Sequence, residues 1–244
     1  MKRKTLVLAG MIMVLLALLL GACGSDSSTP IAINPLKGTW YGTLWDSNGV
    51  LRTITVTVEN NNTTSSVLID NVPSGDYYTI KKAAGYTGIY SATESAGTRG
   101  GFFLDTKGKH LVFVDALFNF SVMQKGATGL PGFSSTDPAG SWSGYEVALD
   151  SFFDITETFK SSAMVTYTST GLDISGSNKY GAIKGDLKGQ QDLNFGLYSG
   201  TMTSPVPAKA VVILTPDKAF AGGVDCKVGG LFPEDCTFSA WSKQ

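Results

Sequence analysis

One short motif occurs twice in this chain and constrains its fold more than any other feature. Residues 38–42 read GTWYG, and residues 140–144 read GSWSG. The segments that follow also match, because GIYSAT at 88–93 returns as GLYSGT at 196–201, and NFSV at 119–122 returns as TFSA at 237–240. Such self-similarity indicates a repeat architecture. The chain is therefore an internal duplication, and each copy is expected to build the same fold.

Both copies have the pattern of an all-β structure. Residues 52–58 (RTITVTV) place Ile54, Val56 and Val58 on one face of a strand and threonines on the other. Turn residues separate the further runs of this kind. The first copy predicts strands near 39–47, 51–59, 64–70, 76–82, 86–93, 99–105, 109–116 and 118–124. The second predicts strands near 141–148, 151–160, 163–169, 178–186, 191–201, 208–214, 218–224 and 235–242, a short extra one at 172–175, and almost no helix.

Strands joined by short connections predict an up-and-down antiparallel sheet, which hides its edges by closing into a barrel. We therefore expect two small barrels, at 36–126 and 139–244, joined by a linker at 127–138. In each barrel the first strand should pair with the last, and few contacts should cross between the copies. A sandwich in place of each barrel, and a single barrel built by both copies, are the alternatives that the sequence leaves open.

The first residues have the order of a secretory signal: MKRK at 1–4, an uncharged apolar run at 5–20, and LGAC at 20–23. This order resembles the lipobox of bacterial lipoproteins. The resemblance implies a signal peptide at 1–22 and a lipid anchor on Cys23, with acyl chains such as palmitate. Gly24 in place of an Asp implies the outer membrane, facing the periplasm or the cell surface. A plain signal peptide with an incidental Cys, or an uncleaved anchor, is the alternative.

The composition of residues 23–35, rich in Ser, Asp, Thr and Pro, predicts a flexible tether between this anchor and the folded part. Without the signal, 16 basic residues face 20 acidic ones, a net charge of −4. No basic patch suits nucleic acid. The two other cysteines, Cys226 and Cys236, lie in the stretch between the last two strands of the second copy, which is eight residues longer than in the first. An oxidising compartment predicts a disulfide between them, and a metal pair lacks further ligands nearby.

The Gly-x-Trp motif on a first strand resembles that of the calycins, the lipocalin- and avidin-like barrels. The resemblance implies that Trp40 and Trp142 close one end of each barrel, with a last-strand cation (Lys125 or Lys243) packed over the ring. It also implies an interior that takes a small apolar or aromatic ligand. The residues expected to line that interior are Trp40, Tyr90, Trp142 and Tyr198.

No constellation for catalysis, a metal or a cofactor is visible in the sequence. His110 is the single histidine and borders an apolar strand, so a surface or capping role is expected. No serine lies in Gly-x-Ser-x-Gly. The acidic group Asp150, Asp154 and Glu157 is expected on a solvated strand face. The sequence therefore predicts a protein that is not an enzyme.

Two functions remain. The first is a non-catalytic structural or interaction protein of the cell envelope, with an envelope protein or a polysaccharide as partner and with outward aromatics such as Tyr41, Trp45, Tyr77 and Tyr78 in contact. The alternative is a calycin-like carrier of a small apolar ligand. Short, glycine-rich copies favour the first function, because they are expected to leave little interior volume.

Overall fold

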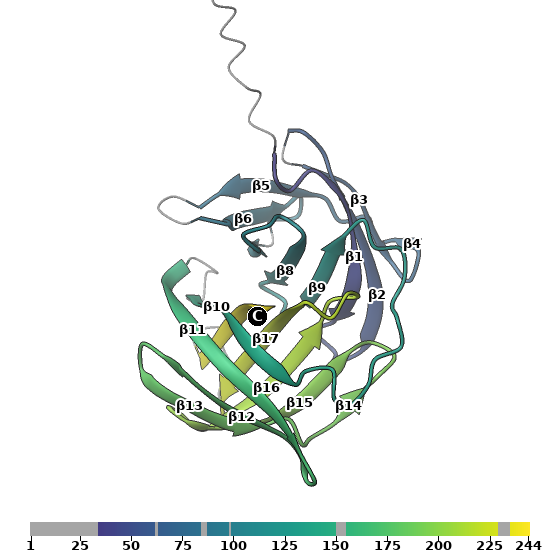
Figure 1. The fold of residues 1–244 in the computed structure, drawn as a ribbon. Coiled ribbons are helices and arrows are strands. Elements are labelled where there is room, and N and C mark those ends of the chain that lie inside the picture. Colours follow the sequence, from purple (N-terminus) through teal and green to yellow (C-terminus); the bar gives the residue numbers. More distant parts are fainter. Residues whose placement is uncertain (1–33, 62, 84–86, 98, 150–154, 229–234) are drawn as a thin grey trace, which may run out of the picture. The chain divides into compact units, whose positions relative to one another are not determined.

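The first copy forms one antiparallel sheet in the computed structural model, which describes residues 34–244 except 62, 84–86, 98, 150–154 and 229–234. The sheet order is β4-β3-β2-β1-β9-β8-β7-β6-β5. One isolated bridge, Thr63 to Thr79, links the β3 and β5 sides, so the sheet is a curved and incompletely closed barrel (Figure 1). The strands are β1 (Gly38–Trp45), β2 (Leu51–Val58), β3 (Thr64–Ile69), β4 (Val72–Pro73), β5 (Tyr78–Lys82), β6 (Ile89–Glu94), β7 (Arg99–Leu104), β8 (His110–Asp115) and β9 (Phe120–Lys125).

The second copy repeats this order and closes fully. Its sheet runs β13-β12-β11-β10-β18-β17-β16-β15-β14, and a further pairing of β13 with β15 completes an eight-stranded barrel. The predicted all-β, antiparallel, barrel-like fold is confirmed. The strands are β10 (Gly140–Leu149), β11 (Ile155–Thr168), β12 (Gly171–Asn178), β13 (Gly181–Asp186), β14 (Gln191–Asp192), β15 (Leu197–Ser204), β16 (Ala208–Leu214), β17 (Phe220–Lys227) and β18 (Cys236–Lys243).

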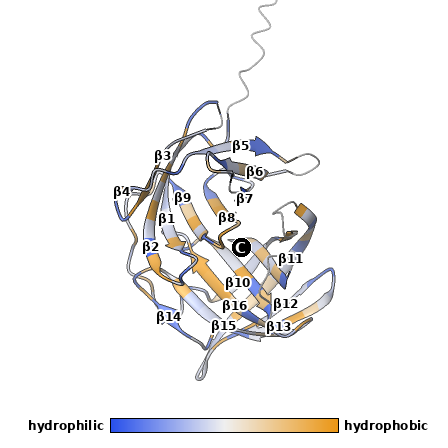
Figure 2. Cartoon of the chain, turned by 180° about the vertical axis from the view of Figure 1, so that it is seen from behind, coloured by the Kyte–Doolittle hydropathy of each residue, from blue (hydrophilic) through white to orange (hydrophobic). Residues whose placement is uncertain are grey.

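The first and last strands of each copy pair, as the sequence predicts. Trp40 lies opposite Lys125 in the β1–β9 register, and Trp142 lies opposite Lys243 in the β10–β18 register. Hydrophobic and hydrophilic residues alternate along the strands (Figure 2). One face of each sheet therefore lines the lumen of its barrel, while the other faces solvent or the second copy.

The predicted division of residues 151–169 into two strands is wrong, because 155–168 form the single strand β11. The two predicted strands were divided at residues 161–162. Ser161 instead continues the inward face of the strand, where its hydroxyl accepts the indole N–H of Trp241 at 2.6 Å. Likewise, the extra strand expected at 172–175 is the full-length β12. A buried serine with a partner in the lumen interrupts the apolar pattern without ending the strand.

Both glycines of the repeated motif are required by close approaches. Gly38 has a φ of +127°, and a Cβ there would lie 2.8 Å from Cε of Lys125, which crosses over it to reach Trp40. Gly140 is equivalent, with a φ of +134° and Lys243 Cε at 2.9 Å. A Cβ on Gly42 would lie 2.0 Å from the carbonyl oxygen of Val122. The motif therefore sets how the last strand and its lysine cross the first strand.

The expectation that few contacts cross between the copies is wrong. Residues Pro35–Gln244 form one compact unit, and the outer faces of both sheets share one apolar cluster. Phe120 and its counterpart Phe238 lie with ring centroids 6.4 Å apart. The principal members are Ile89, Phe103, Val112, Val114, Phe120 and Val122 from the first copy, and Leu197, Ile213, Phe220, Val224, Phe238 and Ala240 from the second.

This contact has the symmetry of the duplication, because most members of the shared cluster occupy equivalent positions in the two copies. The most reduced position is Gly222, the counterpart of Val112. A Cβ on Gly222 would lie 2.5 Å from Cγ2 of Val122 and 2.8 Å from Cγ2 of Val112. The valine of one copy therefore fills the space that the glycine of the other leaves.

The segment predicted as a linker, 127–138, is packed against the second barrel. Phe133 is buried, and its backbone N–H donates to the carbonyl oxygen of Leu193. Asp137 forms an ion pair with Lys218 at 2.8 Å. The predicted signal peptide, Cys23 and nearly all of the predicted tether lie outside the described residues. Within the described part of the chain, no helix is long and apolar enough to cross a membrane.

Candidate functional site

The four aromatic residues predicted to line a ligand site are buried outside the cavities, and the two tryptophans close one end of each barrel. Trp40 is fully buried and donates its indole N–H to the carbonyl oxygen of Leu36 at 2.7 Å. Lys125 Nζ lies 5.2 Å from the centroid of the Trp40 ring, the cation contact that the family resemblance implied. This end of the first lumen is therefore filled by protein side chains.

The second barrel has the same closed end. Trp142 donates to the carbonyl oxygen of Pro138 at 2.8 Å, and Lys243 Nζ lies 5.4 Å from the Trp142 ring. Tyr198 is buried, and its hydroxyl donates to the carbonyl oxygen of Ser134 at 2.6 Å. Tyr90 is buried in the core of the first sheet. None of the four lines the cavities described below.

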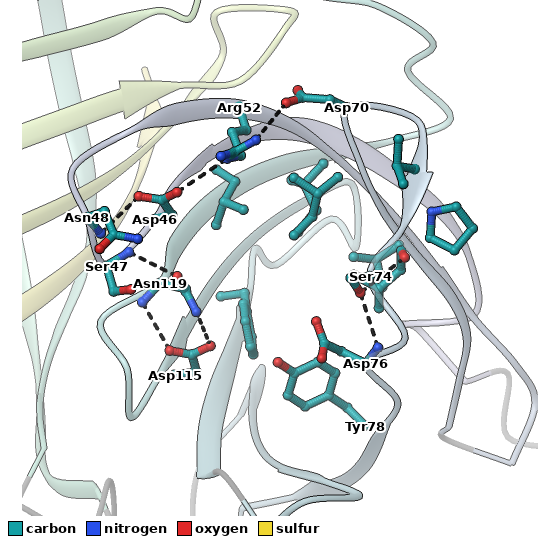
Figure 3. A pocket seen from close by; sticks show the side chains of 18 of the residues that line it. Asp46, Ser47, Asn48, Arg52, Asp70, Ser74, Asp76, Tyr78, Asp115 and Asn119 are labelled. Atoms are coloured by element: carbon teal, nitrogen blue, oxygen red, sulfur yellow. Dashed lines mark hydrogen bonds and ion pairs between the residues drawn. The ribbon is translucent and has the colours of Figure 1, made fainter.

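A cavity of ≈560 Å³ opens at the other end of the first lumen. Its wall is the inward apolar face of the sheet, and its mouth carries charged and amide side chains (Figure 3). The volume falls within the roughly 300–1,000 Å³ of small-molecule sites. The apolar wall comprises Leu44, Ile54, Val56, Val67, Ile69, Phe102 and Phe113, and the polar mouth comprises Asp46, Asn48, Arg52, Asp70, Asp76, Tyr78, Asp115 and Asn119.

Arg52 spans one side of this mouth between two carboxylates. Its Nε lies 3.3 Å from Oδ2 of Asp46, and its Nη1 lies 3.3 Å from Oδ2 of Asp70 (Figure 3). Burial tends to raise the pKa of Asp46, but the backbone N–H groups of Val50 and Asn48 and then Arg52 lower it overall. The backbone N–H of Thr53 is the main cause of the lowered pKa of Asp70. Both carboxylates are therefore ionised partners of one guanidinium.

Asp115, at the end of β8, is the most deeply buried carboxyl group of the cavity, with an exposed fraction of 2%. Oδ1 accepts from the backbone N–H groups of Leu117 and Asn119 at 2.9 and 3.0 Å, and Oδ2 accepts from Asn119 Nδ2 at 2.9 Å. Burial raises the pKa of Asp115 in spite of these bonds. The carboxylate is thus held by neutral donors only.

Asp76 and Tyr78 lie together on another side of the cavity (Figure 3). Tyr78 was expected among outward aromatics, but it points into the lumen with 8% of its surface exposed, while the adjacent Tyr77 is exposed. Burial, followed by the charges of Asp115, Glu94 and Asp76, raises the pKa of Tyr78. The phenol is therefore neutral and able to donate or accept a hydrogen bond.

The second lumen has a smaller and more polar cavity of ≈350 Å³. Glu146, the counterpart of Leu44, is buried there and accepts from Asn178 Nδ2 at 3.1 Å. Burial raises the pKa of Glu146, although Asn178 and Ser161 oppose this. Burial, and then the charge of Glu146, raise the pKa of Asp225 to about 7. Asp225 is the counterpart of Asp115, so both lumens carry a carboxyl group at the same position.

The surface or capping role expected for His110 is wrong, since the side chain is buried between the copies with 5% exposed. Nδ1 lies 2.8 Å from Oδ2 of Asp105, and Nε2 lies 2.8 Å from Oδ2 of Asp217 in the second copy. Burial alone would lower the pKa of His110, but hydrogen bonds and charge from Asp105 and Asp217 raise it overall. His110 therefore bridges the two copies through both ring nitrogens, and the two carboxylates favour its protonated form.

Two further hollows run along the boundary between the copies, with volumes of ≈870 and ≈730 Å³. Trp45 and Phe118 of the first copy and Val211 and Phe238 of the second line the latter. Trp45, expected to point outward, packs against the shared cluster. This hollow is the most apolar surface that the copies present together.

The disulfide between Cys226 and Cys236 is present, and these residues lie opposite one another in the β17–β18 register. Glu157 bonds Lys179 and Tyr180 at the surface. Asp150 and Asp154 lie outside the described residues, as does the predicted lipid site Cys23. No group of three or more His, Cys, Asp or Glu in the described ranges is placed to hold a metal ion.

One feature of the sequence could have indicated the cavity residues that were not predicted. Asp115 ends the apolar run LVFVD, and Asp225 occupies the matching place in the second copy. An acidic residue retained at the end of a buried strand in both copies indicates a position inside each lumen. The orientation of Tyr78 has no comparable signal, because Tyr77 and Tyr78 are adjacent and one residue of register decides which of them points inward.

Comparisons with known proteins give no functional assignment. No protein-family model and no curated protein matches the sequence. Among solved structures, the chain is similar to a protein of unknown function from the DUF3598 family of Nostoc punctiforme. The two are 14% identical over 87% of this chain and 97% of that chain, with a TM-score of 0.35. Function is therefore inferred from the geometry of the described residues.

Proposed function

We propose that this protein is a non-catalytic carrier that holds a small, largely apolar molecule in the first lumen. The observation that carries the proposal is the ≈560 Å³ cavity, whose wall is apolar and whose polar groups gather at the mouth. An apolar wall with a few placed polar groups is typical of small-molecule sites. The closed end formed by Trp40 and Lys125 leaves the opposite mouth as the entrance.

The cavity volume also changes the balance between the two functions considered from the sequence. A structural or interaction role was favoured because the copies were expected to leave little interior volume. The volumes of ≈560 and ≈350 Å³ favour the carrier instead. The interaction role is kept as the second candidate, because the apolar hollow lined by Trp45 and Phe118 offers a surface for an envelope partner.

The proposal includes a membrane location. Residues 1–23 have the order of a lipoprotein signal, and a chain with two or three acyl groups on Cys23 would stay anchored. Residues 24–35 would then hold the barrels off the outer membrane, on its periplasmic or outer side. The carrier would collect or deliver its ligand at that surface.

Occlusion of the first cavity tests the carrier function. Ile69 belongs to the apolar wall, next to Asp70 of the mouth, and is only partly buried, so Ile69→Trp should fill the cavity near its entrance with little strain on the core. The purified protein should bind a neutral apolar fluorophore such as N-phenyl-1-naphthylamine, and Ile69→Trp should abolish most of the signal. Ile69→Leu is the matched control and should bind as the wild type does. If no apolar probe binds the wild type, the carrier function is wrong and the interaction role takes its place.

A further inference from the structure

The charges around the first cavity do not balance. Along its described lining, four aspartates accompany the single cation Arg52. Arg52 is engaged by Asp46 and Asp70, at 3.3 Å from each. Asp76 and Asp115 reach the cavity from opposite sides in Figure 3, and no cation of the described lining pairs with either. The side of the polar mouth formed by Asp76 and Asp115 therefore carries uncompensated negative charge.

The Asp115 part of this negative charge lies where water is largely excluded. Asp115 is almost fully buried, and its three hydrogen bonds come from neutral donors, two of them backbone N–H groups. A buried carboxylate without a counter-charge is unfavourable. The charge of Asp76 adds to this, because it contributes to the raised pKa of Asp115. A cation placed between the two carboxylates would supply the missing counter-charge to Asp115 and offset its repulsion by Asp76.

Aromatic groups complete the site. The Tyr78 hydroxyl makes no hydrogen bond to a described residue. Only 8% of the Tyr78 surface is exposed. Its ring meets that of Phe113 edge-on, with centroids 5.2 Å apart. Aromatic faces attract cations, and a hydroxyl on a residue that lines the cavity can hydrogen-bond to a ligand held there. The apolar wall formed by Ile54, Val56 and Val67 continues from this point.

We infer that the molecule carried in the first lumen is an amphiphilic cation, with an ammonium head between Asp76, Asp115 and Tyr78 and an apolar body along the inner face of β2 and β3. This inference rests on the proposed carrier function and assigns the chemical class of its ligand. A primary ammonium donates hydrogen bonds to the two carboxylates and to the Tyr78 oxygen. An apolar molecule with an anionic head meets the same carboxylates and is excluded.

Three probes with the same dodecyl chain test the inference: dodecylamine, dodecanol and dodecanoate, each kept below its micelle concentration and competed against the neutral fluorophore. The amine should bind about tenfold more tightly than the alcohol, a difference of roughly 1.4 kcal/mol, and the carboxylate should bind most weakly. The preference for the amine should shrink as salt is raised, because the mouth is open to solvent. Equal affinities for all three, or tightest binding of dodecanoate, would overturn the cationic ligand and leave the carrier function standing. If none of the three binds, the carrier function itself fails.

Two variants locate the head group. The Asp76 carboxylate makes no hydrogen bond that holds the fold, so Asp76→Asn should weaken dodecylamine binding several-fold and leave dodecanol binding unchanged. Tyr78→Phe keeps the ring and should weaken the amine by about threefold, as expected for one hydrogen bond. Asp173→Asn removes the same charge from the exterior of the second barrel, where Asp173 pairs with Lys188, and should change neither affinity. The head-group assignment is wrong if Asp76→Asn weakens the amine and the alcohol alike.

Discussion

The imidazole of His110 stacks on the ring of Phe220, its own counterpart in the second copy, with centroids 5.2 Å apart and an angle of 10° between the planes. The two residues open equivalent strands, β8 and β17, and the hairpins before them have the same turn: Asp105 N–H donates to His110 O, and Thr215 N–H donates to Phe220 O. Only one of the two hairpins supplies a carboxylate across the boundary, Asp217. The symmetric contact therefore contains a single asymmetric, titratable bridge.

That bridge predicts how stability depends on pH. The folded-state pKa of His110 lies above its ordinary value. The stabilisation that protonated His110 gives to the fold is therefore complete below about pH 6.5. The contribution is then lost as pH rises through the higher folded-state value. The pKa values of Asp105 and Asp217 are lowered, in each case because hydrogen bonds outweigh the effect of burial. Their contribution is present above about pH 4 and is lost as pH falls through the lower folded values.

Asp217→Asn tests the bridge. The amide oxygen can still accept from Thr215 Oγ1 and Ala219 N, as Oδ1 does now, so the turn is kept and only the contact with His110 is lost. We expect the free energy of unfolding at pH 6 to fall by about 1–3 kcal/mol and the slope between pH 6 and 9 to flatten. Urea unfolding across this range measures both, with Asp173→Asn as the control. A wild-type pH profile in Asp217→Asn would show that the bridge is not the titrating element.

The fit of Gly222 against Val112 and Val122 predicts a sharp contrast between neighbouring substitutions. Gly222→Ala places a methyl group 2.5 Å from Cγ2 of Val122, so we expect a loss of roughly 1–3 kcal/mol as the sheets are pushed apart. Gly223 faces the lumen, and a Cβ there meets nothing closer than 3.5 Å. Gly223→Ala should therefore leave stability within about 0.5 kcal/mol of the wild type. Equal melting temperatures for the two variants would contradict the shared interface.

Asp225 should change the pH dependence of folding stability in the opposite direction to a salt-bridged aspartate. Its folded-state pKa of about 7 lies above the ordinary 3.8. Between these values the folded protein binds a proton that the unfolded chain has released, so stability falls as pH rises from about 4 to 7. Asp225→Asn should remove this fall and stabilise the protein at pH 8 by an amount of the order of 1 kcal/mol or more. Thermal melts at pH 5 and pH 8 measure the effect, and a loss of stability at pH 8 would refute it.

The disulfide links residues ten positions apart in the chain, and the entropy of so short a loop limits its effect to about 2–3 kcal/mol. We expect the double variant Cys226→Ala/Cys236→Ala to unfold at lower urea by that amount and to keep its β-type circular dichroism. Peptide mapping without reductant should find the two residues linked in the wild type. Recovery of two alkylatable thiols from the native protein would rule out the bridge.

The predicted anchor is tested by Cys23→Ser. Signal processing and acylation should both stop, because the thiol is the proposed site of lipid attachment. The variant should accumulate at precursor size and take up no labelled palmitate, whereas Cys226→Ala should be processed as the wild type is. Labelling of Cys23→Ser at mature size would place the lipid elsewhere.

The fold was predictable because its signals are local. Period-two alternation places the strands of the first copy to within a few residues, and the repeated Gly-x-Trp motif placed the first strand of each copy. The errors lie where a polar residue points inward. Ser161 fell in the gap between two predicted strands. Its inward position could not be predicted locally, because its partner, Trp241, lies eighty positions away in the chain.

The candidate site was much less predictable, because its residues acquire their roles through distant contacts. His110 meets Asp217 across 107 positions, and no short motif encodes that approach. Trp40 and Trp142 lie at the closed ends that the family resemblance implied, but neither lines a lumen cavity, a position that was also expected of them. The open end is built from ordinary residues such as Asp76 and Ile69, which matter only because strand curvature brings them around one cavity.

The symmetry of the contact between copies also limits how far such a chain can grow. Each copy begins and ends at one place, since β1 pairs with β9 and β10 pairs with β18, so a further copy could be appended without disturbing the sheets already formed. However, each copy uses the same outer face to meet the other, as Phe120 and Phe238 show. A self-complementary face is saturated by a single partner. A tandem of three would leave one apolar face exposed to water, so copies of this kind bury their outer faces in pairs.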